Sequence, residues 1–313
     1  MWRPITTADV PAWCELLAAA EAVDATSEHY DVDDLLEELS DPALDAERDA
    51  VAAFDQDGRM AAYGLVRGAV VVHGVHRVHA EGCVHPAHRR SGLGREVLGR
   101  TARRAAQLRR PDLPGELLVY TYDGNAGAAA LLSSAGLRPV RYWYDMHRDL
   151  DGPLPEVLVP EGLRLVGYEP ELDEALRLAR NDAFADHWGS VQRDQPSWRH
   201  WFTGCRAFRP ALSFAMLAGD EVAGLLLCNS YDADDAASGV RQAWAATIGT
   251  RSPWRRRGVA TALLARALAA YTAAGYQRAA LSVDTGNPTG ALGVYQRCGF
   301  SVNTRWTTYA RPL

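Results

Sequence analysis

The sequence contains no lysine, so all 33 of its Lys and Arg residues are arginine. Cysteine is scarce as well: there are five, scattered along the chain and never spaced as Cys-x-x-Cys. This usage argues against a disulfide framework and against a zinc site, and we expect no metal. No apolar run approaches the roughly 20 residues that a membrane span needs, so we expect no membrane partner.

The chain also lacks an excess of positive charge, with a formal net charge of -6 at pH 7. A protein that binds nucleic acid would carry a basic stripe, so we expect no nucleic-acid partner. Hydrophobic residues make up 48% and charged residues 23%, as in ordinary soluble globular proteins. The N-terminus lacks the apolar core of a signal peptide, which predicts a cytoplasmic protein. We expect the protein to be a monomer or a homodimer. At 313 residues, the length favours two domains.

The most informative feature is an internal repeat. When Arg89 is aligned with Arg255, 166 residues later, Gly92 falls on Gly258. The repeated motif reads Arg-x-x-Gly-x-Gly in the first copy and Arg-x-x-Gly-x-Ala in the second. In each copy it follows a predicted apolar strand and opens a predicted helix rich in alanine and leucine. The strands are expected at 77–84 and 242–250, and the helices at about 92–108 and 258–274.

Each half of the chain shows the same predicted order: a helix, a strand hairpin, a strand, the glycine motif, a helix, a strand, a helix and a strand. This order predicts an α/β protein of two tandem domains, each with a mixed, mostly antiparallel sheet flanked by helices. Residues 151–162 contain three prolines and are expected to form an extended linker. We therefore predict domains at 1–150 and 163–313.

The position of the glycine motif between a strand and a helix indicates an anion site. At a helix N-terminus, unpaired backbone N–H groups and the positive end of the helix dipole converge, which suits a pyrophosphate. Gly258 would let the backbone approach the phosphates. The alternative is a tight strand-to-helix turn with solvated arginines. A Rossmann dinucleotide site fits poorly, because its motif follows the first strand of a parallel βαβ unit.

These motifs carry a resemblance to a known superfamily. The C-terminal half contains Arg255-x-x-Gly258-x-Ala260, Asn287 and Tyr295-x-x-x-Gly299-Phe300. The N-terminal half contains Arg89-x-x-Gly92-x-Gly94, Asn125 and Gly136. Both halves resemble the GNAT superfamily of N-acetyltransferases, and the tandem layout is similar to that of the mycothiol synthases of actinobacteria. The resemblance implies acetyl-CoA as the co-substrate and a small-molecule amine as the partner.

The resemblance also assigns residues to acetyl-CoA binding. In the superfamily, the backbone of the strand before the motif holds the thioester and pantetheine, and the motif holds the phosphates. In the C-terminal half these positions are Ile248, Gly249, Thr250, Arg255, Arg256, Arg257, Gly258, Val259, Ala260 and Asn287. In the N-terminal half they are Val84, Arg89, Arg90, Ser91, Gly92, Leu93 and Gly94. For Asn287, plain turn chemistry is an equal alternative.

The two halves differ at the position implied for the catalytic acid. Tyr295 matches the tyrosine that the superfamily places near the CoA sulfur, where a phenol can protonate the leaving thiolate. A packed aromatic side chain is the alternative. The N-terminal half has Leu132 there, although it has Glu81 on its motif strand, where the C-terminal half has Thr247. We therefore expect the C-terminal domain to be catalytic and the N-terminal domain to be non-catalytic while still able to bind CoA.

The acceptor needs a base, because an alkylammonium group with a pKa near 10 must lose a proton before it attacks. Candidates are Asp182, Asp186, His187 and Asp284, and we select His187 and Asp284. A helix-end histidine and a strand-end carboxylate without catalytic roles are the alternatives. The predicted function is direct acetyl transfer from acetyl-CoA to a primary amine of a small molecule. Two alternatives stay open: mycothiol synthase-like acetylation of a cysteinyl-sugar, and a non-catalytic CoA-binding regulator.

Overall fold

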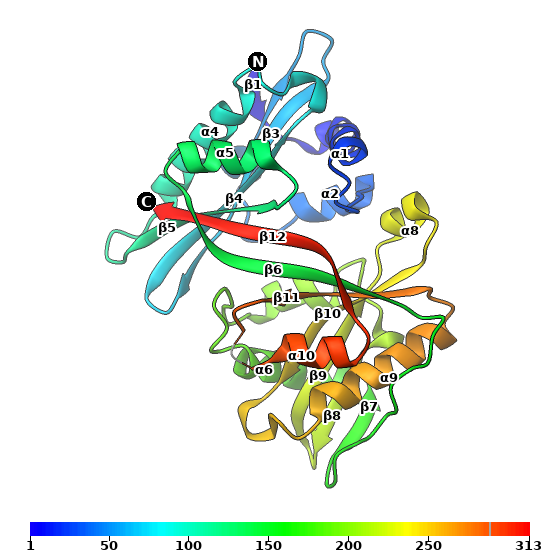
Figure 1. Cartoon of the computed structure of the whole chain (residues 1–313). Helices are drawn as coiled ribbons and strands as arrows, with labels where there is room; N and C mark the ends of the chain where they lie inside the picture. Colours follow the sequence, from blue (N-terminus) through cyan, green and yellow to red (C-terminus); the bar gives the residue numbers. More distant parts are fainter. Residues whose placement is uncertain (288) are drawn as a thin grey trace. The chain divides into compact units, whose positions relative to one another are not determined.

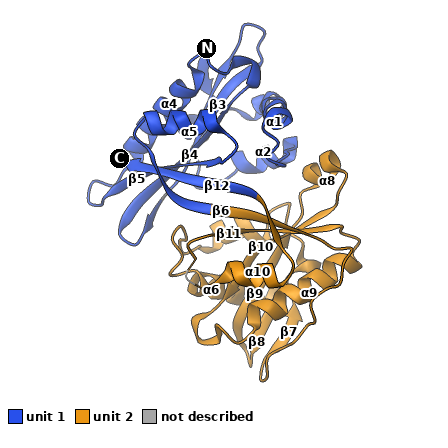
Figure 2. Cartoon of the chain, viewed as in Figure 1, with its two compact units in different colours: residues 1–142, 304–313 blue, residues 143–303 orange. Residues whose placement is uncertain are grey.

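The structure is a computed structural model and describes residues 1–287 and 289–313 (Figure 1). The chain forms two compact units (Figure 2). Unit 1 comprises residues 1–142 and 304–313, and unit 2 comprises residues 143–303. Each unit contains a mixed, mostly antiparallel sheet flanked by helices, which confirms the predicted fold class. In the described part of the chain, every helix is too short or too polar to cross a membrane.

The sheet of unit 1 has the strand order β1-β2-β3-β4-β5-β12. Its pairings are antiparallel except for β4 with β5. The strands are β1 (Trp2–Pro4), β2 (Ala50–Phe54), β3 (Met60–Val72), β4 (Val75–Val84), β5 (Gly115–Tyr122) and β12 (Ser301–Pro312). The helices are α1 (Val10–Asp24), α2 (Val32–Leu39), α3 (Ala46–Asp49), α4 (Leu93–Leu108) and α5 (Ala126–Ser134).

The sheet of unit 2 repeats this plan with the order β6-β11-β10-β9-β8-β7, and β10 with β11 is its parallel pair. The strands are β6 (Arg138–Asp149), β7 (Arg164–Gly167), β8 (Phe214–Ala218), β9 (Glu221–Asn229), β10 (Gln242–Thr250) and β11 (Arg278–Asp284). The helices are α6 (Asp173–Ala183), α7 (Gln195–Trp198), α8 (Asp232–Ser238), α9 (Val259–Ala273) and α10 (Ala291–Arg297). Short helical turns are found at Thr7–Asp9, Pro86–His88, Pro170–Leu172, Arg199–Thr203, Pro210–Leu212 and Ser252–Trp254.

The two faces of the unit 2 sheet are covered by different helices. Successive strand residues point to opposite faces, so Leu226 and Cys228 of β9 join the core with α9 and α10. Leu225 and Leu227, which alternate with them, join a second core with α6. Burial on both faces explains why β9 is apolar along almost its whole length. We call the two sides the α9 face and the α6 face.

The compact units follow strand pairing, whereas the predicted boundaries at 150 and 163 follow the sequence repeat. Residues Trp143–Asp149 of β6 come from the first repeat but pair with β11 of unit 2. Residues Trp306–Pro312 of β12 end the second repeat but pair with β5 of unit 1. Each repeat thus supplies the last strand of the other unit's sheet. Residues 153–160, in the predicted linker, form neither helix nor strand.

Candidate active site

The glycine motif has the same backbone conformation in both units. Its second and fourth residues lie in the left-handed region, with φ of 66° at Arg90, 96° at Gly92, 63° at Arg256 and 84° at Gly258. The two glycines then cap the N-termini of α4 and α9. A turn of this kind groups backbone N–H donors into a nest that binds anions, and the helix dipole adds positive potential. Either turn can therefore hold a pyrophosphate.

The first arginine of each motif connects the turn by hydrogen bonds to the end of an earlier helix, α1 in unit 1 and α6 in unit 2. Arg89 Nε donates to the Val84 carbonyl at 3.2 Å, and its Nη atoms donate to Asp24, the last residue of α1, at 2.8 and 2.6 Å. Arg255 Nε donates to the Thr250 carbonyl at 3.2 Å. Its Nη2 donates at 3.0 Å to the carbonyl of the last residue of α6, Ala183. The exposed Arg256 and Arg257 are left to face an anion in unit 2.

The parallel strands separate beside the turn. In unit 2, β10 and β11 pair only as far as Trp244 and Ala280. In unit 1, β4 and β5 pair as far as Ala80 and Val119, which is two residues further in the repeat alignment. We call the opening between β10 and β11 the split. It exposes backbone groups of β10 that have no partner on β11, as a pantetheine arm requires.

A β-bulge distinguishes the motif strand of unit 2. The pairing of β10 with β9 shifts register between Ala245 and Thr247, directly after the last parallel pair. In unit 1, β4 pairs with β3 without a shift from Val84 to His79. A bulge leaves one residue outside the ladder and turns its backbone groups away from the neighbouring strand. In unit 2 this residue is Ala246, so its backbone groups lie outside the ladder at the apex of the split.

Further residues predicted to bind acetyl-CoA lie on β10 after the bulge and at the start of α9. Ile248 packs against the α9 core, and Val259 is buried under the helix start. At Gly249 an added Cβ would lie 3.0 Å from Phe184 and 3.2 Å from Ala183, so only glycine fits there without displacing the end of α6. The Thr250 hydroxyl oxygen is buried and has no hydrogen-bond partner within the described residues. An unpaired buried hydroxyl is costly, so a ligand that satisfies it would be favoured.

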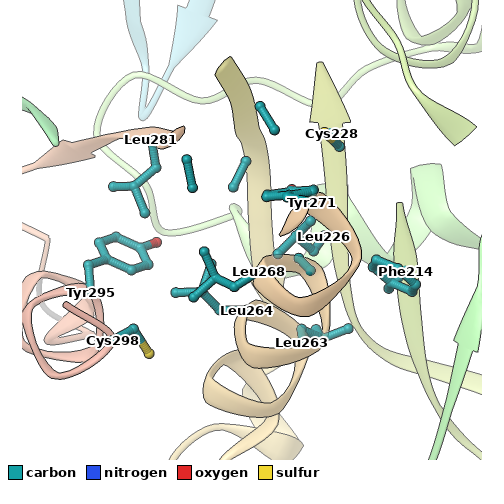
Figure 3. Close-up of a cluster of buried hydrophobic side chains, with 14 of the residues drawn as sticks. Phe214, Leu226, Cys228, Leu263, Leu264, Leu268, Tyr271, Leu281, Tyr295 and Cys298 are labelled. Carbon is teal, nitrogen blue, oxygen red and sulfur yellow. The ribbon is translucent and has the colours of Figure 1, made fainter. Parts of the chain in front are cut away.

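Tyr295 lies on α10 and is 7% exposed. Its ring packs on the α9 face against Leu281 of β11 and Leu264 of α9, and its hydroxyl points away from α10 (Figure 3). Because Leu281 directly follows the last parallel pair, the phenol lies next to the split. Burial raises the pKa of Tyr295 to about 12. The phenol is therefore protonated at neutral pH and can act as a proton donor.

His187 and Asp284, selected separately from the sequence, come together in unit 2. His187 Nε2 lies 3.7 Å from Asp284 Oδ2, with the Asp284 side chain fully buried and that of His187 18% exposed. The Asp284 carboxylate also accepts a hydrogen bond from the Gly286 amide at 2.9 Å. The imidazole contacts the rings of Trp143 and Phe184, with centroids 5.9 and 5.6 Å away. Sequence reasoning missed Trp143, because it belongs to the first repeat.

Unit 1 has a cavity of about 620 Å³ between its glycine motif and the strands β4 and β5. Five of its seven predicted binding residues line this cavity: Val84, Arg89, Arg90, Gly92 and Gly94. The other two, Ser91 and Leu93, lie between them in the sequence, and the Ser91 hydroxyl donates to the His88 carbonyl at 2.5 Å. Leu132 lines the cavity where unit 2 has its tyrosine. The cavity has the composition of a ligand site without a proton donor at that position.

Two further side chains in the repeat are held by neighbouring residues. The Glu81 carboxylate on the unit 1 motif strand receives two hydrogen bonds of 3.1 Å from Arg67, which also forms an ion pair with Glu38. Asn287 accepts hydrogen bonds from the Thr289 amide at 2.9 Å and from the Thr289 hydroxyl at 2.7 Å. Its counterpart Asn125 caps α5 through the Ala128 amide at 2.9 Å. Asn287 thus makes the turn contacts that the sequence left as an alternative, and Asn125 makes similar contacts in unit 1.

Comparison with known proteins agrees with this geometry. Residues 173–300 match the model of the acetyltransferase (GNAT) family. A mycothiol acetyltransferase of Salinispora arenicola is 29% identical over 317 residues, covering 98% of this chain and 92% of the relative. A mycothiol acetyltransferase of Thermobispora bispora is 33% identical over 232 residues, covering 72% of each chain.

Solved structures match the whole chain. A GCN5-related N-acetyltransferase from Sphaerobacter thermophilus has a TM-score of 0.77 at 26% identity, covering 100% of this chain and 95% of that one. A tandem GNAT protein from the clavulanic acid biosynthesis pathway has a TM-score of 0.74 at 19% identity, covering 100% and 98%. These structures confirm the tandem GNAT architecture expected from the repeat. The family match and the sequence relatives identify the protein as an acyltransferase.

Proposed function

Because the chain belongs to the GNAT acetyltransferase family, we propose that its C-terminal half, within unit 2, transfers the acetyl group of acetyl-CoA directly to a primary amine of a small molecule. The observation that carries this proposal is the buried, protonated phenol of Tyr295 beside the split. Its counterpart in unit 1 is Leu132, which has no proton to donate. The bulge in β10, which unit 1 lacks at the same place, supports the same assignment.

Each part of unit 2 has a role in this reaction. The N–H groups at the start of α9, with Arg256 and Arg257, hold the pyrophosphate. Backbone donors at the bulge polarise the thioester carbonyl and stabilise the oxyanion as it forms. The amine nitrogen bonds to the carbonyl carbon, the carbon–sulfur bond breaks, and Tyr295 donates its proton to the departing sulfur. Acetyl-CoA supplies the activated acyl group, and the residues of the chain supply position and proton transfer.

For unit 1 we propose CoA binding without transfer. The motif has the same left-handed turn as in unit 2, and the cavity of about 620 Å³ lies beside it. Two features speak against catalysis there: Leu132 replaces the acid, and Arg67 holds the Glu81 carboxylate at 3.1 Å. An acetyl-CoA bound in unit 1 would therefore keep its thioester.

A second candidate acceptor is a cysteinyl-sugar, acetylated on its amine. The observation in its favour is that relatives spanning nearly the whole chain are named mycothiol acetyltransferases. This acceptor is itself a primary amine, so it narrows the first proposal without changing the chemistry. Turnover of the cysteinyl-sugar in preference to simple alkylamines would support it.

The test is an assay of the full chain with acetyl-CoA and a panel of primary amines, read by mass spectrometry of the N-acetylated product. This readout also works for acceptors that carry a thiol, because it does not depend on detecting the thiol of released CoA. Tyr295→Phe should lower kcat by about 10²–10⁴-fold, the usual contribution of a general acid. Tyr271→Phe is the matched control, because this buried phenol lies in the same core but on α9, beside Cys228 (Figure 3). Equal activities of the two variants, or no product with any amine, would refute the proposal.

A further inference from the structure

The two faces of β11 present different chemistry to the split. Leu281 and Val283 point to the α9 face, where Tyr295 lies. Ser282 and Asp284 alternate with them and therefore point to the α6 face. The proton donor and the buried carboxylate thus lie on opposite sides of one strand. Direct transfer needs this arrangement, since the sulfur must gain a proton on one side of the reacting carbon while the amine loses one on the other.

Two other acids near the end of α6 are engaged elsewhere. The Asp182 carboxylate lies 2.5 Å from Arg251 Nε. The side chain of Asp186 is 77% exposed and lies 3.8 Å from Arg255 Nη1. By contrast, His187 faces a fully buried carboxylate at 3.7 Å, and two aromatic rings border its imidazole. Among the four candidate bases, His187 combines a suitable intrinsic pKa with a group that orients it.

The surrounding face is suited to a positively charged group. Strand pairing places Trp143 beside Asp284 and Asp145 beside Ser282, so β6 adds a second carboxylate and an indole ring to the same face. Carboxylates attract an ammonium ion through charge, and an indole ring attracts it through its π face. These groups come from β6 and β11, and His187 comes from the segment after α6.

We propose that His187 is the general base that takes the proton of the acceptor amine, that Asp284 is its positioning residue, and that the α6 face around them receives the acceptor as an alkylammonium ion. This inference rests on the proposed function and names the base and the acceptor side of that site. Apo distances between such groups are often longer than a hydrogen bond and shorten when substrate binds.

The proton balance of the step is complete. The ammonium group passes one proton to Nδ1 of His187, and the imidazolium is stabilised by the Asp284 carboxylate facing Nε2. The neutral amine then forms the carbon–nitrogen bond, and the carbon–sulfur bond breaks. Tyr295 protonates the sulfur, and the second amine proton is released to solvent as the amide forms. Exchange with solvent returns His187 and Tyr295 to their starting states.

The pairing can be tested without any turnover, by NMR titration of the His187 imidazole in the full chain. His187→Gln identifies its resonance among those of the nine histidines. Asp284→Asn should lower the pKa of His187 by about 1 unit or more, because the variant loses the charge that stabilises the imidazolium. Asp186→Asn, which removes the neighbouring exposed carboxylate in the same segment, should lower it less. An unchanged titration in Asp284→Asn would overturn the pairing.

Kinetics with the amine panel then test the base. For an alkylamine at neutral pH, His187→Gln should lower kcat/KM by about 10²-fold or more, and Asp284→Asn by about tenfold to hundredfold, with the acidic limb of the pH profile moved to lower pH. Asp186→Asn should stay within about twofold of the wild type. With an alkoxyamine, which is already unprotonated, His187→Gln should lose much less.

Equal losses on the two amines would overturn the base role of His187 while leaving the proposed function intact. A wild-type chain that acetylates no amine would instead reject the proposed function and the base role together. The NMR result would still decide whether Asp284 orients His187.

Discussion

At the scale of single residues, the two units differ most where Tyr295 corresponds to Leu132. Both side chains are buried, at 7% and 3% exposure, so either residue can fill this position in the core. The phenol differs in carrying a proton, and burial keeps that proton in place by disfavouring the phenolate. One substitution therefore separates a unit with a proton donor from a unit without one at this position.

The raised pKa of Tyr295 predicts a pH effect on stability. A tyrosine in the unfolded chain ionises near pH 10, whereas the buried phenol ionises at about 12. Between these values the folded chain holds a proton that the unfolded chain has lost, so the free energy of unfolding falls as pH rises. The contribution of Tyr295 should be about 1.4 kcal/mol between pH 9 and pH 11.

Urea unfolding of the wild type and of Tyr295→Phe at these two pH values measures this contribution. The variant should lose less stability over the interval, and the difference between the two proteins should stay constant between pH 7 and pH 9. The same loss in both proteins from pH 9 to pH 11 would contradict the burial argument.

At this scale, the sequence indicated which residues could carry the chemistry more reliably than it indicated which residues they contact. His187 and Asp284 were each selected for their chemistry, yet their contact depends on the path of α6 and β11 and has no local signal. Arg255 was assigned to acetyl-CoA because, in the superfamily that the sequence resembles, the motif holds the phosphates. The structure gives it three contacts within the protein, with Thr250, Ala183 and Asp186.

At the scale of elements, the glycine turn is the part most fully predicted from sequence. Its place between a strand and a helix followed from hydrophobic patterning, and its repetition 166 residues later removed the ambiguity of a short motif. The left-handed conformations of Arg90 and Arg256 were not predicted, because arginine has no preference for positive φ. They follow from the need to turn the chain between a fixed strand end and a fixed helix start.

A matched pair of substitutions tests the turn in each unit. Gly258→Asp and Gly92→Asp each place a side chain at positive φ, at a cost of about 1–2 kcal/mol, and add a negative charge at the phosphate position. Neither Cβ meets an atom closer than 3.9 Å, so both variants should fold. In calorimetric titration with CoA, the wild type should bind two equivalents and each variant one, and Gly258→Asp should also lose acetyl transfer.

Loss of transfer in Gly92→Asp with full transfer in Gly258→Asp would place catalysis in unit 1 and contradict the proposed division of roles. A single equivalent of CoA bound by the wild type would contradict ligand binding by unit 1.

At the scale of the whole molecule, the exchange of terminal strands could not be read from the sequence. A repeat alignment assigns each strand to the copy in which it is encoded, and nothing local in the sequences of β6 and β12 indicates which sheet each strand joins. The consequence reaches the site: Trp143, which contacts His187, is encoded in the first repeat but acts in unit 2. Domain boundaries taken from the repeat would separate this residue from the histidine that it contacts.

The exchange predicts how the chain can be divided. A fragment of residues 143–303 includes the β6 segment that pairs with β11 through seven residue pairs, from Trp143 with Asp284 to Asp149 with Arg278. A fragment of residues 163–303 contains His187, Asp284 and Tyr295 but lacks that segment. Without that segment, one edge of β11 would have no partner strand, and the core would lack the Met146 side chain. The longer fragment should therefore unfold cooperatively with urea, protect the β11 amides from hydrogen exchange and bind CoA. The shorter one should show little protection and no binding, and equal behaviour of the two would mean that the exchanged strand is dispensable for unit 2.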